Sequence, residues 1–203
     1  MKKKKFERKK ELINAALDEF TLRNYEKASL NTIIKNAGIS KGTFYYHFQN
    51  KQALYLFLLE SASNAKWGFM NKIIQEKGTD LEGKDIFEGF KIQAQIGMEF
   101  AVLFPKYHEL SIMFSKEKGN KIYEDAKSIL GVRTEAMMDE MVEKAMQRGD
   151  FNKKFSKDFI VKIMSFLFMG FDEIFGNKED LELENMVQNL NSYVDFMKYG
   201  LGK

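Results

Sequence analysis

The residue types that this sequence lacks already exclude several classes of protein. Its 203 residues contain no cysteine, which excludes disulfide bonds, thiolate metal sites and a cysteine nucleophile. The two histidines, His47 and His108, are too few to build a zinc site on imidazole ligands. We therefore expect neither a structural metal nor a bound cofactor.

Proline is almost as scarce, and its scarcity indicates helices. The chain has one proline, whereas average usage predicts roughly ten in a chain of this length. Loops and turns recruit proline, and helix interiors exclude it. The composition thus favours an all-α fold with short connections, and 19 Phe and 12 Met indicate an aromatic, pliable core.

Long apolar runs are also absent. The longest, residues 163–171, has nine residues, about half of what a membrane-spanning helix needs. The lysines at positions 2–5 are not followed by an apolar stretch, so the start of the chain lacks the pattern of a signal peptide. We expect a soluble, cytoplasmic protein with no membrane segment.

Charge is divided unevenly along the chain. Residues 1–51 hold 12 Lys and Arg against 5 Asp and Glu, a net charge of +7, whereas residues 52–203 hold 20 against 24, a net charge of −4. A small basic part on a larger acidic one suggests a polyanionic partner such as nucleic acid. Because residues 2–5 are all lysines, a basic arm that only aids solubility is the alternative reading of the charge alone.

Apolar residues recur with the period of an amphipathic helix in about nine segments, and no segment alternates as a strand would. Ser29, Ser40 and Asn50 are the expected N-cap residues of three of these helices, and Pro105 is expected to end another. The helices are expected at residues 6–22, 30–37, 41–48, 51–75, 85–104, 107–114, 120–147, 156–175 and 180–199.

Two short capped helices around the turn at residues 37–40 have the layout of a helix-turn-helix. At about 100° per residue, Phe44 and Phe48 of the second helix share one face, and Tyr46 points away from it. Tyr45 and His47 flank the core face. Hydroxyl and imidazole groups bind phosphates and base edges, so the outward set indicates DNA binding, although packing on a neighbouring domain is the alternative for any one residue.

At this point the sequence resembles a known family. Residues 20–54, and above all the stretch AGISKGTFYYHFQNK at 37–51, resemble the DNA-binding signature of the TetR family of transcriptional regulators. The resemblance implies an N-terminal three-helix DNA-binding domain over residues 1–50 and a C-terminal helical domain for ligand binding and dimerisation over residues 51–203.

The resemblance also implies which residues bind double-stranded DNA. Base or groove contacts are expected from Lys41, Thr43 and Tyr46. Phosphate contacts are expected from Tyr45, His47 and Lys51, with support from Ser29 and Asn31 and close approach of the helix to the groove at Gly42.

The segment 156–175 is apolar nearly all round, so both of its sides must be covered. One side can face its own domain, and a second copy of the chain can cover the other. Together with the last helix it would form a four-helix bundle across a two-fold homodimer, as the resemblance also implies. A purely internal core is the alternative for the last helix. The expected interface residues are Ile163, Phe166, Phe171, Met186, Leu190 and Met197.

The resemblance further implies a cavity in the C-terminal domain for a small molecule that releases the protein from its operator. An aromatic and Met-rich cavity would suit a lipophilic effector. Ordinary core packing is the alternative for every candidate. The candidate lining residues are Trp67, Phe100, Phe104, His108, Met137, Met141 and Phe168.

The sequence therefore favours a dimeric DNA-binding regulator, in the simplest case a repressor of a palindromic operator. A protein of the same fold that binds another protein instead of DNA is the alternative. An enzyme is least favoured, because the sequence has no Glu-x-x-His pair, no phosphate-binding glycine loop and no nucleophile elbow.

Overall fold

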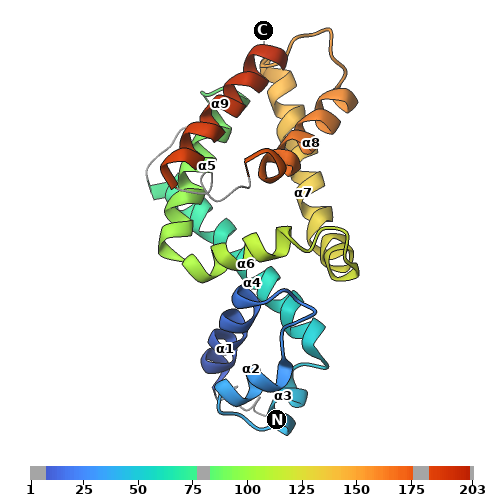
Figure 1. Cartoon of the computed structure of the whole chain (residues 1–203). Helices are drawn as coiled ribbons and strands as arrows, with labels where there is room; N and C mark the ends of the chain where they lie inside the picture. Colours follow the sequence, from blue (N-terminus) through green and yellow to red (C-terminus); the bar gives the residue numbers. More distant parts are fainter. Residues whose placement is uncertain (1–7, 77–82, 176–182, 202–203) are drawn as a thin grey trace, which may run out of the picture. The chain divides into compact units, whose positions relative to one another are not determined.

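The computed structural model describes residues 8–76, 83–175 and 183–201, except for the side chains of 129–135, 168–173, 183 and 201. Within these residues it contains nine α-helices and no extended strand, so the predicted all-α fold is confirmed (Figure 1). The helices are α1 (Lys9–Leu22), α2 (Leu30–Asn36), α3 (Lys41–His47), α4 (Lys51–Glu76), α5 (Ile86–Leu103), α6 (Pro105–Ser115), α7 (Lys121–Arg148), α8 (Lys157–Phe175) and α9 (Leu183–Leu201).

Packing divides the chain into two compact units. The first consists of Met1–Lys66 with Leu103–Ile129, and the second of Trp67–Val102 with Leu130–Lys203. Helix α6 and the first part of α7 therefore belong with the N-terminal helices. The division after residue 50 that the resemblance implies separates functional domains, whereas these units are defined by packing, and it stays a prediction.

In the first unit, helices α1, α2 and α3 lie close to the start of α4 (Figure 1), and each of them buries apolar side chains. Those of α1 recur one turn apart, as the predicted amphipathic pattern requires. Burial of each large apolar side chain stabilises the fold by about 1.5–3 kcal/mol. The side chains that are fully buried here are Leu12, Ala16, Phe20, Ile33, Phe44, Leu54 and Leu58.

The three predicted N-caps begin their helices as expected. The hydroxyl oxygens of Ser29 and Ser40 accept hydrogen bonds from the backbone N–H three residues further on, at 3.3 and 3.0 Å. The side-chain oxygen of Asn50 accepts the corresponding bond at 2.8 Å. Such a cap contributes about 1 kcal/mol, which matters most for α2 and α3 because each has only seven residues.

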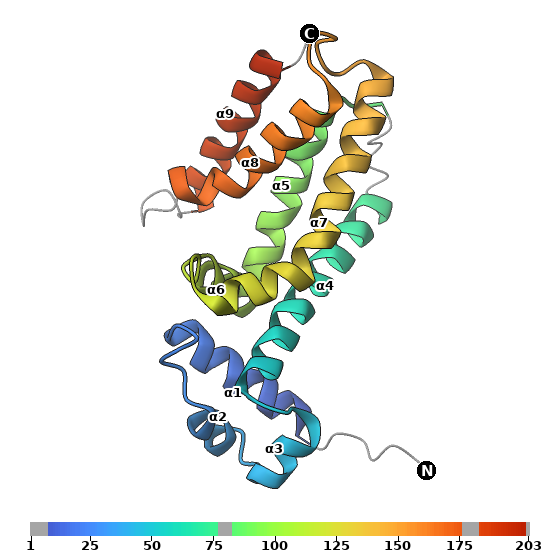
Figure 2. The same cartoon turned by 90° about the vertical axis from the view of Figure 1, so that its right-hand side faces the viewer.

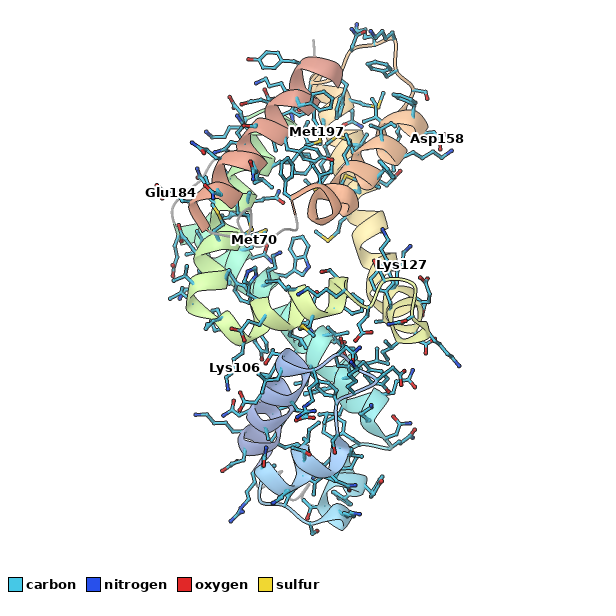
Figure 3. The ribbon with its side chains drawn as sticks, viewed as in Figure 1. Met70, Lys106, Lys127, Asp158, Glu184 and Met197 are labelled. Atoms are coloured by element: carbon cyan, nitrogen blue, oxygen red, sulfur yellow. The ribbon has the colours of Figure 1, made fainter. Side chains whose placement is uncertain are left out.

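Pro105 opens a helix as well as closing one. Helix α5 ends at Leu103, one residue before the predicted end at 104, and α6 begins at Pro105 and not at the predicted Tyr107. Proline fits the first position of a helix because the N–H that it lacks would have no partner there. Within the first unit α6 lies against α1, and Lys106, labelled in Figure 3, forms an ion pair with Asp18 of α1.

The second unit has its own core, to which α5, α7, α8 and α9 all contribute. Helices α8 and α9 lie side by side (Figure 2). The hydroxyl of Tyr193 on α9 donates a hydrogen bond of 3.0 Å to the backbone oxygen of Leu167 on α8. The buried residues of this core include Phe87, Phe90, Met138, Val142, Ile160, Met164, Val194 and Met197.

None of the helices that the model describes has the length and apolar character needed to cross a membrane.

Candidate nucleic-acid interface

The turn between α2 and α3 has the geometry of a helix-turn-helix. Gly38 has a φ of 62°, in the left-handed region that favours glycine. Its N–H donates to the backbone oxygen of Lys35 at 3.1 Å, and the N–H of Ile39 donates to that of Ile34 at 3.3 Å. These two bonds form the motif that commonly ends an α-helix, so the chain leaves α2 in a defined direction.

Arg8 holds this turn from the start of α1. Its Nη1 donates a hydrogen bond of 2.7 Å to the backbone oxygen of Gly38. Arg8 itself has a φ of 61°, a conformation that is uncommon for a residue with a side chain. A contact over 30 positions of sequence thus fixes the turn against α1.

The outer face of α3 carries the aromatic groups that the sequence predicted. Phe44 is fully buried, whereas Tyr46 is 77% exposed and Tyr45 is 56% exposed. The ring of Tyr46 meets the ring of His47 edge-on at 4.8 Å, and that of Tyr45 meets Phe44 edge-on at 5.2 Å. The predicted outward direction of Tyr46 is therefore confirmed.

The other predicted residues of α3 lie at its first turn. Lys41 and Gly42 are exposed, and Thr43 is half-buried. The hydroxyl groups of Thr43 and Ser40 share a hydrogen bond of 2.9 Å. A Cβ at Gly42 would lie 3.7 Å from the Ser40 hydroxyl, an ordinary contact. The chain itself therefore does not require glycine there, and its role in approaching DNA stays a prediction.

The two predicted residues of α2 differ in their surroundings. Ser29 is half-buried and serves as the N-cap, while Asn31 is exposed. The backbone N–H of Ser29 donates to Oε1 of Glu19 at 2.8 Å. Glu19 is 6% exposed and lies on the buried face of α1, one turn from Ala15 and Ala16. A carboxylate on the apolar face of a predicted helix indicates a buried hydrogen-bond partner, and the sequence analysis did not use this indication.

Lys51 is held by the loop that joins α1 to α2. Its ammonium donates to the backbone oxygens of Tyr25, Glu26 and Ala28 at 2.6, 3.3 and 3.0 Å. It also lies 4.4 Å from the centre of the Tyr25 ring, a distance at which a cation is attracted to the ring. The predicted phosphate contact of Lys51 stays a prediction, and the structure shows a different set of partners.

The same loop has a second partner that the sequence did not reveal. Oε1 of Glu117, in the connection between α6 and α7, accepts a hydrogen bond of 2.5 Å from the backbone N–H of Tyr25. Glu117 is 1% exposed. Burial raises the pKa of the nearby Tyr55 well above its usual value, and the charge of Glu117 adds to this shift. Burial is also the main cause of the raised pKa of Tyr25.

The predicted effector-binding residues fall in both packing units. Phe104 and His108 belong to the first unit, where Phe104 is 40% exposed. Trp67, Phe100, Met137 and Met141 belong to the second unit. There Phe100 is buried with its ring 5.8 Å from that of Phe69, and Met141 packs against the core. The side chain of Phe168 lies outside the described residues.

The predicted interface residues range from exposed to fully buried. Phe166 is 70% exposed, and Met186 and Leu190 are half-buried. Ile163 packs against the core of the second unit. Met197, labelled in Figure 3, is 1% exposed in the single chain, so it offers no surface to a partner. The side chain of Phe171 is not among those described.

Comparison with known proteins finds similarity to one family of regulators. Residues 12–57 match the family model described as "Bacterial regulatory proteins, tetR family". The chain is 32% identical over 82 residues to the uncharacterized HTH-type transcriptional regulator YdgC of Bacillus subtilis (strain 168), over 40% of this chain and 42% of that protein. It is 25% identical over 172 residues to the "Probable acrEF/envCD operon repressor" of Escherichia coli (strain K12), over 80% of this chain and 73% of that protein.

Solved structures show the same similarity at the level of the fold. A TetR family transcriptional regulator from Chloroflexus aurantiacus J-10-FL superposes with a TM-score of 0.67 at 19% identity, over 97% of this chain and 94% of that one. A transcriptional regulator from Saccharomonospora viridis, solved in complex with choline, superposes with a TM-score of 0.65 at 18% identity, over 96% and 97%.

Fold and site together define an all-α protein with an N-terminal helix-turn-helix. The N-terminal part of the chain, residues 12–57, matches the TetR family model, and the fold is that of solved TetR family regulators. The relatives named above are an HTH-type transcriptional regulator and a probable operon repressor. Among the described residues, no group of three His, Asp or Glu side chains is placed to hold a metal ion.

The turn geometry predicts that Gly38→Ala destabilises the protein. An alanine at this positive φ costs about 1–2 kcal/mol, and its Cβ would lie 2.9 Å from Nη1 of Arg8, which would have to move. Urea unfolding should show a loss of that size. The matched control is Gly68→Ala, within α4, where a Cβ meets nothing within 4 Å and alanine should stabilise the helix by up to about 1 kcal/mol. Equal stability of the Gly38→Ala variant and the wild type would contradict the turn assignment.

Proposed function

We propose that this regulator binds a palindromic operator as a homodimer and represses transcription until a lipophilic small molecule releases it. The observation that carries the proposal is the outer face of α3, where Tyr46 and Tyr45 stand exposed next to Lys41 on a capped helix-turn-helix. Two exposed tyrosines on a seven-residue helix are costly for solubility unless they bind a partner. The net charge of +7 over residues 1–51 favours a polyanion as that partner.

The side chains on α3 suit the major groove. The ammonium of Lys41 and the hydroxyl groups of Thr43 and Tyr46 can donate to base edges or groove phosphates. Tyr45 and His47 flank this face and are the proposed phosphate ligands. Ser29 and Asn31 support them from α2. Lys51 was also expected to bind phosphate, but its ammonium is engaged with three loop carbonyls, so we leave it out of the proposed set of phosphate ligands.

The proposed dimer rests on apolar side chains that α8 and α9 expose in the single chain. Phe166 of α8 is 70% exposed, and Phe196 and Tyr199 of α9 are 69% and 85% exposed. Exposed aromatic groups on two adjacent helices are typical of an interface. A two-fold axis through these helices would place two copies of α3 on one duplex, and half-sites about one helical turn apart would then match a palindrome.

The repressor role and the effector are supported by relatives and by composition. The relative with the longest alignment described above carries the name of an operon repressor, and a protein of the same fold was solved with choline. The second unit contains Trp67, Phe100, Met137 and Met141, whose apolar side chains suit a lipophilic molecule. A regulator that acts on chromosomal DNA would work in the bacterial cytoplasm.

The proposed role of α3 predicts that Tyr46→Ala weakens specific DNA binding. Operator fragments selected with the wild-type protein should bind the variant about 10- to 100-fold more weakly, the usual effect of losing a base contact. Tyr46→Phe keeps the ring and loses the hydroxyl, so its affinity for the same fragments should lie between those of the wild type and Tyr46→Ala. Leu22→Ala is the control, because Leu22 is 80% exposed on α1 outside the proposed interface. Selection that enriches no DNA fragment would favour a protein-binding adaptor of the same fold.

The proposed interface predicts that Phe196→Glu dissociates the dimer. A carboxylate placed between two apolar helices would lose its hydration without gaining a partner. Analytical ultracentrifugation should find a dimer for the wild type and a monomer for the variant at the same concentration. Leu22→Glu introduces the same charge at an exposed leucine of α1 and should leave the dimer intact. A dimeric Phe196→Glu variant would place the interface elsewhere.

A further inference from the structure

The loop between α1 and α2 is held from two sides by residues outside the helix-turn-helix itself. On one side the ammonium of Lys51, the first residue of α4, binds the backbone oxygens of Tyr25, Glu26 and Ala28. Ala28 directly precedes Ser29, the N-cap of α2. Lys51 therefore fixes the backbone up to the residue at which the DNA-binding motif begins.

On the other side the loop is held by the connection between α6 and α7. Oε1 of Glu117 accepts the N–H of Tyr25 at 2.5 Å, and Oε2 accepts Nδ2 of Asn120 at 2.6 Å. The connection turns at Gly119, whose φ is 89°, and the N–H of Asn120 donates to the backbone oxygen of Glu117 at 2.9 Å. Both carboxylate oxygens of a residue that is 1% exposed are thus satisfied, and one of them is satisfied by the loop.

Tyr25 is the point at which the two sides meet. Its N–H is bound by Glu117 and its backbone oxygen by Lys51, so two consecutive peptide groups are fixed. Its ring lies over the Lys51 ammonium and 5.1 Å from the ring of Tyr55. Few degrees of freedom are left to the loop while these contacts hold.

We propose that Glu117 is a positioning residue for DNA binding: by holding the N–H of Tyr25 it sets the path of the loop into α2, and hence the placement of α2 and α3, without touching DNA. The proposal rests on the proposed function of α3. Glu117 lies 92 positions after its partner Tyr25. It therefore affects operator affinity from the part of the chain that was predicted to bind the effector.

The effect on affinity follows from the shortness of the motif. Helices of seven residues are only marginally stable without tertiary contacts. The contacts that hold the loop leading into α2 therefore also decide in what fraction of molecules α2 and α3 are correctly placed. When the carboxylate is removed, the N–H of Tyr25 loses its buried acceptor, and the loop gains conformations in which water can bind that group. DNA then binds only the remaining competent fraction of the protein, and the apparent affinity falls to that fraction of its original value.

The test compares three variants of the full chain. Glu117→Ala removes the acceptor and should weaken operator binding by about tenfold, the effect expected from losing one hydrogen bond to a buried charged group. Glu117→Gln keeps an oxygen that can accept from Tyr25, while the Asn120 amide can turn to accept from the new amide group, so affinity should return to near the wild-type value. Glu109→Ala removes an equal charge from an exposed position of α6 and is the matched control.

Two further readouts separate positioning from a direct contact and from general loss of structure. The slope of log affinity against log salt concentration should be the same for Glu117→Ala and the wild type, because no phosphate contact is lost. Hydrogen exchange at the Tyr25 amide should be faster in Glu117→Ala and normal in Glu117→Gln. If Glu117→Ala loses helix content, the same measurements are made on Glu117→Asp. Its side chain is shorter by one methylene, so the carboxylate is also drawn away from the N–H of Tyr25.

The outcomes distinguish this proposal from the function on which it rests. Weaker binding with an unchanged salt slope, restored by glutamine, supports the positioning role. A wild type that binds DNA while Glu117→Ala binds it equally well overturns the positioning role alone, as does a loss that glutamine does not restore. A wild type that binds no DNA fragment overturns the proposed function, and the positioning role with it.

Discussion

The DNA-binding part of this protein depends on the hydrogen bonds that one ammonium group donates to three backbone oxygens. Lys51 binds the loop between α1 and α2 at Tyr25, Glu26 and Ala28. Backbone oxygens in a loop have no ladder partners, and a half-buried cation that satisfies three of them gives the loop a single path. That path ends at Ser29, so the start of α2 is decided by a residue of α4.

The rest of the motif follows from this fixed entry. Glu19 binds the N–H of Ser29, Gly38 turns the chain after α2, and Arg8 holds that turn from the start of α1. Phe44 anchors α3 in the core, so the opposite side of α3 must carry Tyr46 outward. A helix of seven residues can thus present a defined polar face, although its own backbone hydrogen bonds could not hold it in place.

Local physics made much of this predictable from the sequence. The 3.6-residue period located the helices, the side chains of Ser29, Ser40 and Asn50 marked three starts, and the angular step of a helix directed Tyr46 away from Phe44. Contacts between distant residues were not predictable in this way. Nothing local distinguishes Glu117 from the exposed acids around it, because its burial depends on a loop 92 positions earlier. Met197 shows the same limit: an apolar stripe on α9 predicts burial, but whether the partner is its own core or a second chain depends on the fold.

The measurement that tests this account most directly is the salt dependence of operator binding for the wild type and for Lys51→Met. The wild type should show a steep, linear fall of log affinity with log salt concentration, because phosphates are neutralised when it binds. Lys51→Met should give a parallel line at weaker binding, because it loses the hold on the loop and no phosphate contact. If the line for Lys51→Met is flatter than that of the wild type by about one unit of slope, Lys51 is a phosphate ligand. If the affinity of the wild type does not change with salt concentration, the account as a whole is contradicted.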